Sequence, residues 1–254
     1  MSRLAALAGV ITPAAYILGD VLLLGGVPRR RHAILDDPRL NESVEGMLEQ
    51  PSSSLRAGAL AGALASPGYL AGGIARWRLA SGPTGRPTST AAAGILLLAA
   101  AEGYAGYIHS MFYPFGEFIR LAEAQRIWET ERGLVPEDVN AEAELVRDPA
   151  RPVVDSHALV EKSQEVAKAI TPGHLVYFSG QVIGSALLGW EIARGRTGYS
   201  RLEALLVPPA LPIAAAIAAT ARVKGGRHAL RGAGLSLGAA ISGIATLAAS
   251  LRRA

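Results

Sequence analysis

"GILLLAAAEGYAGYIHSMFYP", residues 94–114, is apolar enough to lie in a lipid bilayer, yet it contains Glu102 near its middle and His109 two turns later. About 20 mostly apolar residues are needed for a helix to cross roughly 30 Å of hydrocarbon. A charged side chain at the bilayer centre costs about 2.5–3.5 kcal/mol on insertion scales, so such residues usually face the interior of a helix bundle. The stretch therefore predicts a membrane helix whose polar face is turned toward other helices.

The composition of the whole chain points to the same class. Of 254 residues, 50% are hydrophobic and only 18% are charged, with a mean hydropathy of +0.27, whereas soluble domains carry about 25% charged residues. The chain has no cysteine, which excludes disulfides, thiolate metal sites and a cysteine nucleophile. The sequence pI is near 9.6, but the basic clusters 29–31, 76–78 and 222–231 lie between apolar runs. They are typical of loops beside membrane helices and do not indicate a nucleic-acid interface.

The predicted architecture is an all-α, polytopic membrane helix bundle forming one integral domain over residues 1–254, in the cell membrane. Six runs are long enough to span the bilayer, about 4–26, 55–75, 88–114, 171–193, 202–221 and 229–251. The second and sixth are rich in small residues and should pack closely against neighbours. Between the third and fourth spans, residues 115–170 form a long, acidic, extramembrane helical section, because 12 of the 21 acids lie between Glu117 and Glu165.

Two features of that acidic section have sequence signals. Residues 116–132 place Phe118, Leu121 and Trp128 at helical spacing, which favours a helix lying along the membrane surface. Asp155 or Ser156 is a candidate N-cap for a second helix that leads into the fourth span.

Polar residues from three predicted spans fall at similar depths. If the N-terminus lies on side A of the membrane, Glu102 is near the middle of its span, and Asp20, His109 and His174 lie toward side B. Helical spacing puts Glu102, His109 and Tyr113 on one stripe, and aligns His174 with Tyr177 and Gln181. The predicted site consists of Glu102 as acid, Asp20 as base or charge stabiliser, and pocket residues Tyr16, His109, Tyr113, His174, Tyr177 and Gln181. A purely structural role for Glu102, paired with His109 or tyrosines, is the alternative.

Two carboxyls in different environments are a recurring way to separate acid and base roles. The predicted function is acid–base chemistry, such as isomerisation or cyclisation, on a lipophilic, isoprenoid-like molecule. The alternatives are a proton-coupled transporter and a non-catalytic membrane partner protein. A transporter needs polar residues in both halves of its path, and the last two spans offer little beyond Thr220, Ser236, Ser242 and Thr246. The enzyme is favoured for that reason.

No cofactor or metal is predicted. No span contains a DDxxD-type pair, and the HExxH and GxSxG motifs are absent. Retinal is disfavoured because no lysine lies in a predicted span, and haem because His109 and His174 are the only histidines in spans. The expected partners are the lipid bilayer and a lipophilic small molecule.

Residues 195–213, "GRTGYSRLEALLVPPALPI", resemble a turn-plus-helix element of bacterial six-helix integral membrane proteins of uncharacterised function. Ser200 and Leu202 stand where that pattern has Pro and Trp. This resemblance implies a six-helix membrane fold and no activity. In size and buried acids the chain is also similar to integral-membrane terpene cyclases, without a shared motif, so no catalytic residue is carried over from them.

Overall fold

Every regular element in the computed structural model is a helix among the residues it describes, which are 2–27, 31–40, 44–132, 155–221 and 233–253. The all-α prediction is therefore confirmed for this part of the chain. The α-helices are α1 (Ser2–Leu24), α2 (Glu45–Leu48), α3 (Ser52–Ala65), α4 (Pro67–Ser81), α5 (Ser89–Glu131), α7 (Ser156–Ala193), α8 (Ala210–Thr220) and α10 (Gly234–Arg252). Short 3-10 turns are η1 (Ala33–Asp36), η3 (Gly82–Thr84) and η5 (Arg201–Leu205).

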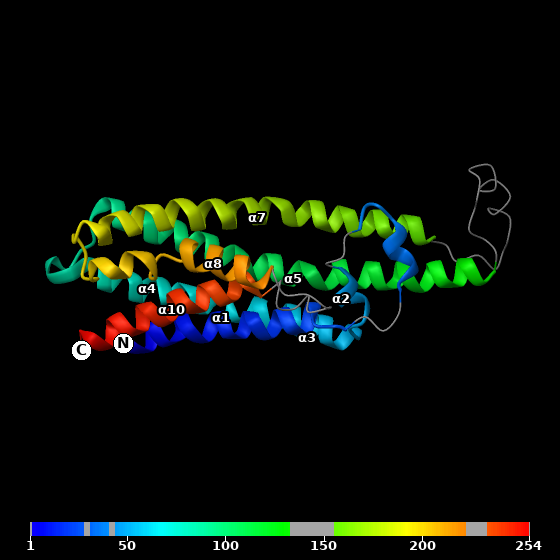
Figure 1. The fold of residues 1–254 in the computed structure, drawn as a ribbon, viewed down its shortest axis with the longest axis horizontal. Helices are drawn as coiled ribbons and strands as arrows, with labels where there is room; N and C mark the ends of the chain where they lie inside the picture. The colour runs from blue at the N-terminus through cyan, green and yellow to red at the C-terminus, as the bar shows by residue number, and fades with distance from the viewer. Residues whose placement is uncertain (1, 28–30, 41–43, 133–154, 222–232, 254) are drawn as a thin grey trace.

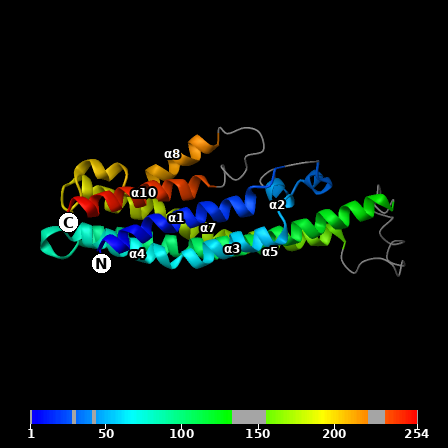
Figure 2. The same ribbon diagram turned by 90° about the horizontal axis from the view of Figure 1, so that it is seen from below.

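The helices form an elongated bundle in which the chain runs back and forth along one axis (Figure 1). The N-terminus, the C-terminus, η3 and η5 lie at one end, which we call the terminal end. α1 leaves this end, α3 and α4 return to it, and α5 leaves again, as both views show (Figures 1 and 2). α5 and α7 pair along their length and extend past the other helices at the opposite end.

The length of α5 differs from the sequence prediction. It runs for 43 residues without a break, about 65 Å at 1.5 Å per residue, or roughly twice the thickness of a bilayer core. The helix predicted over residues 116–132 is present, but it continues the third span without a break at Pro114. Its placement along a membrane surface stays a prediction, and the continuous helix does not favour it. Pro114 removes one backbone donor, but the helix continues across it, as proline-containing helices can when they are well packed.

α7 mirrors this arrangement over 38 residues and continues through Pro172. Its N-cap is Asp155, whose side chain accepts from the backbone N–H of Ala158 at 2.6 Å, which confirms one of the two predicted caps. We call residues 115–131 of α5 and 156–170 of α7 the stalk. The rest of the predicted acidic section, residues 133–154, lies outside the described residues.

Two of the six predicted spans are interrupted. The run 55–75 is divided between α3 and α4 at Ser66–Pro67. The run 202–221 contains most of the turn η5 and then the 11-residue helix α8, which begins directly after Pro208 and Pro209. Among the described residues, three helices are long and apolar enough to cross a membrane: α1, α5 and α10.

Small residues bring the helices into close contact, as the glycine- and alanine-rich runs predict. Gly9 of α1 touches Gly72 of α4, and a Cβ on Gly243 of α10 would lie 2.2 Å from the Gly9 carbonyl oxygen. Gly94 and Gly184 make the same kind of contact between α5 and α7. A methyl group at these positions would force the backbones apart.

Candidate functional site

Three helices bring an acid, an imidazole and a hydroxyl together in the middle of the bundle. Nε2 of His109 on α5 lies 3.0 Å from Oδ1 of Asp20 on α1, and the Ser236 hydroxyl on α10 donates to Oδ2 of Asp20 at 2.8 Å. Asp20 and His109 are only 8% and 5% exposed. We call Asp20 and His109 the acid–imidazole pair.

The His109 ring packs against glycines of two neighbouring helices, where a larger side chain would not fit. A Cβ on Gly62 of α3 would lie 2.4 Å from the imidazole, and one on Gly19 of α1 would lie 2.7 Å from it. The second ring nitrogen, Nδ1, is 3.3 Å from the carbonyl oxygen of Gly58. A carbonyl only accepts hydrogen bonds, so Nδ1 carries a proton in this arrangement. Nε2 faces the Asp20 carboxylate at 3.0 Å, a distance at which a proton between the two atoms lies within hydrogen-bonding reach of both.

The acid–imidazole pair forms part of the wall of a cavity of about 380 Å³, a size within the range of small-molecule pockets. Most of the wall is apolar or aromatic. The lining consists of Tyr16, Asp20, Leu24, Met47, Tyr69, Ala105, Ile108, His109, Phe112, Phe115, His174, Tyr177, Phe178, Ile217, Leu235 and Ser236. Five of the eight predicted site residues are thus brought together: Tyr16, Asp20, His109, His174 and Tyr177.

The other three lie elsewhere. Tyr113 packs in an apolar cluster with Leu23, Met47 and Leu55. Glu102 and Gln181 are 1% and 3% exposed but do not line the cavity. The prediction that all these residues face one pocket therefore holds only in part, because the stripe from Glu102 to Tyr113 meets different neighbours at different levels.

Glu102 has a partner that sequence reasoning missed. Nη1 of Arg76 on α4 donates to Oε1 of Glu102 at 2.7 Å, and Nη2 lies 3.5 Å from the Ser242 hydroxyl on α10. Both ion-pair residues are almost fully buried, at 4% and 1% exposure. Residues 76–78 were assigned to a basic turn, whereas Arg76 lies inside α4 and faces the bundle interior.

Several polar atoms near this ion pair lack hydrogen bonds. Oε2 of Glu102, Nε of Arg76 and both amide atoms of Gln181 are buried without a partner among the described residues. Buried polar groups are otherwise almost always hydrogen-bonded, to protein or to ordered water. This part of the bundle is thus more polar than the sequence indicated.

Tyrosines lie between the two polar groups. The Tyr16 ring meets the His109 ring edge-on at 4.8 Å and lies 5.4 Å from the Tyr69 ring. Tyr69 and Tyr177 are close enough to Glu102 and Arg76 to interact with their charges. The three tyrosines therefore connect the Asp20 side of the bundle with the Glu102 side.

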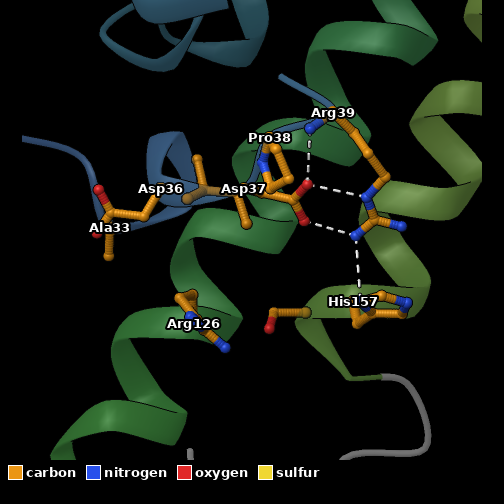
Figure 3. Close-up of a pocket in the computed structure, with 9 residues that line it drawn as sticks. Ala33, Asp36, Asp37, Pro38, Arg39, Arg126 and His157 are labelled. Carbon is orange, nitrogen blue, oxygen red and sulfur yellow. Dashed lines mark hydrogen bonds and ion pairs between the residues drawn. The ribbon is translucent and has the colours of Figure 1, made fainter. Parts of the chain in front are cut away.

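A second cavity, of about 400 Å³, lies at the stalk between η1 and the start of α7. Figure 3 shows Arg39 between Asp37 and His157, with Arg126 of α5 facing the same hollow. Arg39 makes two side-chain contacts with the Asp37 carboxylate, at 2.8 and 2.5 Å, and its Nη2 lies 3.1 Å from Nδ1 of His157. These contacts attach the segment before α2 to α7.

This attachment predicts a pH effect. The Arg39 guanidinium lowers the pKa of Asp37 below its ordinary value of 3.8. The contact therefore stabilises the fold above that value and is lost as the pH falls through the lower pKa of the folded state. In Arg39→Met, we expect the pKa of Asp37 to rise, as measured by NMR titration of its carboxyl carbon. We also expect the free energy of unfolding to fall by about 1 kcal/mol or less. Arg31→Met removes only an exposed pair with Asp36 and is the control; an unchanged Asp37 titration in Arg39→Met would contradict this account.

A buried histidine fixes the same segment to α5. His32 lies 3.2 Å from Glu123 and 3.0 Å from Glu49, and Glu123 also accepts from the backbone N–H of Ile34. Sequence reasoning did not predict this contact, because His32, Glu49 and Glu123 are far apart along the chain. Among the described residues, no group of three His, Asp or Glu side chains is arranged to hold a metal ion.

Comparison of the chain with protein-family models, curated protein sequences and solved structures finds no match. The resemblance of residues 195–213 to uncharacterised six-helix membrane proteins stays a prediction.

Proposed function

We propose that the chain is a multi-pass membrane protein with six crossings, in which α3–α4, α7 and the short α8 complete a bundle with α1, α5 and α10. In the part of the chain that the structure describes, three helices are long and apolar enough to cross a membrane. Many large apolar side chains on the outside of the other helices support a lipid-facing surface there. They include Leu70, Ile74, Leu175, Val182, Ile183, Leu211 and Ile217, each at least 40% exposed. The stalk then projects from side B, and the terminal end faces side A.

Within this bundle we propose acid–base chemistry on a lipophilic small molecule. The observation that carries this proposal is the acid–imidazole pair in the wall of an otherwise apolar and aromatic cavity. An aromatic cavity favours a hydrocarbon ligand, and the pair supplies a proton donor and acceptor within a water-poor site.

The chemistry we propose is proton transfer between the ligand and the acid–imidazole pair. Oδ1 of Asp20 lies 3.0 Å from Nε2 of His109, which supports a pair that holds a proton between the two atoms, passes it to the ligand and regains it. Ser236 and the Gly58 carbonyl hold the two side chains in position. Isomerisation or cyclisation of an isoprenoid-like molecule needs these steps: protonation at one carbon and loss of a proton at another.

The test is hydrogen exchange. The purified protein is incubated in D2O with its co-purifying lipids and with added isoprenoid alcohols and ketones, and the lipids are analysed by mass spectrometry. We expect the wild type to place deuterium on carbon in at least one lipid. A complete absence of carbon-bound deuterium with a bound lipid present would contradict the catalytic proposal and favour a binding protein.

A second candidate is a proton-coupled transporter. The specific observation in its favour is the buried Arg76–Glu102 ion pair, which supplies polar groups on the side A half of the bundle. The sequence argument against transport was the lack of such groups. A transporter would use the acid–imidazole pair and Glu102 in turn, and uptake into vesicles would depend on a pH gradient.

A further inference from the structure

The central cavity has a side opening. Half of its lining residues are buried, among them Tyr16, Tyr69 and Tyr177 at 3%, 4% and 6% exposure. Phe178 of α7 and Ile217 of α8 also line it, yet they are 44% and 40% exposed. A side chain that both lines a cavity and reaches the surface marks its mouth. The mouth therefore lies between α7 and α8, on the flank of the bundle and not at its end.

The two sides of the mouth lie at different levels along the bundle. Gly180 of α7 packs against Ala101 of α5, so Phe178 lies about level with residue 103, six residues before His109. At 1.5 Å per residue this is roughly 9 Å toward the terminal end. Ile217 packs against Gly234 of α10, two residues from the Ser236 that contacts Asp20, so it lies about level with the acid–imidazole pair. The mouth therefore extends from the pair toward the terminal end, the direction in which the chain of a side B lipid runs.

The charges of the lining residues determine whether the polar group of a ligand can itself be charged. The lining contains no Lys or Arg among the described residues, and its carboxylate, Asp20, is already paired with His109. A phosphate or carboxylate would have no cation to pair with, and a buried unpaired charge is very costly. The ligand's polar end is therefore uncharged.

One hydroxyl in the lining is available to it. The Tyr16 hydroxyl is buried without a hydrogen-bond partner among the described residues. The Ser66 hydroxyl is close enough to interact with the Tyr16 oxygen, but the contact lacks the geometry of a hydrogen bond, and Ser66 donates to the Gly103 carbonyl at 3.3 Å. A buried phenol without a partner costs about 1–3 kcal/mol, which an accepting oxygen on a ligand would recover.

We propose that the cavity holds an uncharged single-chain lipid with an oxygen-bearing end, such as an alcohol or ketone. Its oxygen accepts from Tyr16 beside the acid–imidazole pair, and its chain leaves between Phe178 and Ile217 into the bilayer. This inference rests on the membrane placement of the proposed function and names the class of its ligand.

Photolabelling tests it directly. The probe is a hexadecanol that carries a diazirine and an alkyne, applied to the protein in lipid nanodiscs. We expect labelling of cavity-lining residues that unlabelled hexadecanol displaces, while palmitate and hexadecyl phosphate compete at least ~10-fold less well, a difference of about 1.4 kcal/mol. Phe178→Trp and Ile217→Trp narrow the mouth and should lower labelling by about 5-fold or more. Tyr16→Phe removes one hydrogen bond and should weaken binding by about 2- to 12-fold.

The controls lie on the same two helices. Ile183 of α7 and Leu211 of α8 are 51% and 57% exposed and do not line the cavity, so Ile183→Trp and Leu211→Trp should label as the wild type does. Equal competition by hexadecyl phosphate, or equal labelling of all four tryptophan variants, would overturn the proposal. Labelling without deuterium exchange contradicts the catalytic proposal alone, and exchange with unaffected mouth variants contradicts this one alone.

Discussion

Arg76→Met is expected to cost about 3–5 kcal/mol of stability, enough to prevent recovery of folded protein. The substitution leaves Glu102, 1% exposed, without the cation that contacts it at 2.7 Å. Breaking one partner of a buried ion pair leaves an uncompensated charge, which is the main source of so large an effect. The measurement is thermal unfolding in detergent, followed by tryptophan fluorescence and size-exclusion chromatography.

The double variant Arg76→Met/Glu102→Gln separates the charge from the packing. Removing both charges together is often nearly neutral, so we expect most of the lost stability to return. Arg78→Met is the matched control, because Arg78 is on the same helix but exposed, and it should change stability by about 0.5 kcal/mol at most. Equal stability of the Arg76 and Arg78 variants would show that the ion pair has no role in the fold.

The double variant also distinguishes the two candidate functions. If Glu102 carries protons for transport, the folded double variant loses pH-driven uptake. If Glu102 and Arg76 only stabilise the bundle, the double variant keeps both ligand binding and deuterium exchange. The structural role left open for Glu102 in the sequence thus has a direct test, with Arg76 in place of the His109 partner that was considered.

The sequence located the polar residues but not their levels along the bundle. Glu102 and His109 lie on one stripe of α5, as their spacing requires. They contact different helices at different levels along the bundle, however: His109 packs against Gly62 of α3, and Glu102 pairs with Arg76 of α4. No single-sequence signal reports which residue of a neighbouring helix lies opposite, and an arginine near the end of an apolar run is ordinarily a loop residue.

The helix boundaries show where local rules succeed and fail. Asp155 caps α7 because its carboxylate satisfies a free backbone donor, and this is readable from the sequence. α8 begins directly after Pro208 and Pro209, which is an equally local signal. Pro114 does not end α5, because packing of the stalk outweighs the loss of one backbone hydrogen bond. Ile119 and Val160 of the stalk are completely buried together, a tertiary contact that residue spacing does not reveal.

Asp20→Asn is expected to lower the rate of deuterium exchange by about 10²–10⁴-fold, the usual contribution of a positioned acid–base group. Asparagine has nearly the same shape: its amide oxygen can still accept from Nε2 of His109, while its NH2 group can donate to the Ser236 hydroxyl oxygen. It cannot take up a proton, so the shared proton of the acid–imidazole pair is lost while the cavity keeps its form. Hexadecanol labelling should therefore stay near the wild-type level.

Two comparisons make the Asp20 result specific. Ser236→Ala removes one hydrogen bond of 2.8 Å to Asp20, which is worth about 1 kcal/mol, so exchange should fall by less than ~10-fold. The double variant Arg76→Met/Glu102→Gln, which leaves no unpaired buried charge, tests the role that the sequence assigned to Glu102: an equal loss of exchange in this folded variant would make Glu102 the proton donor. Exchange within ~10-fold of the wild type in Asp20→Asn, with normal labelling, would exclude the acid–imidazole pair as the reacting group, because no other carboxylate lines this cavity among the described residues.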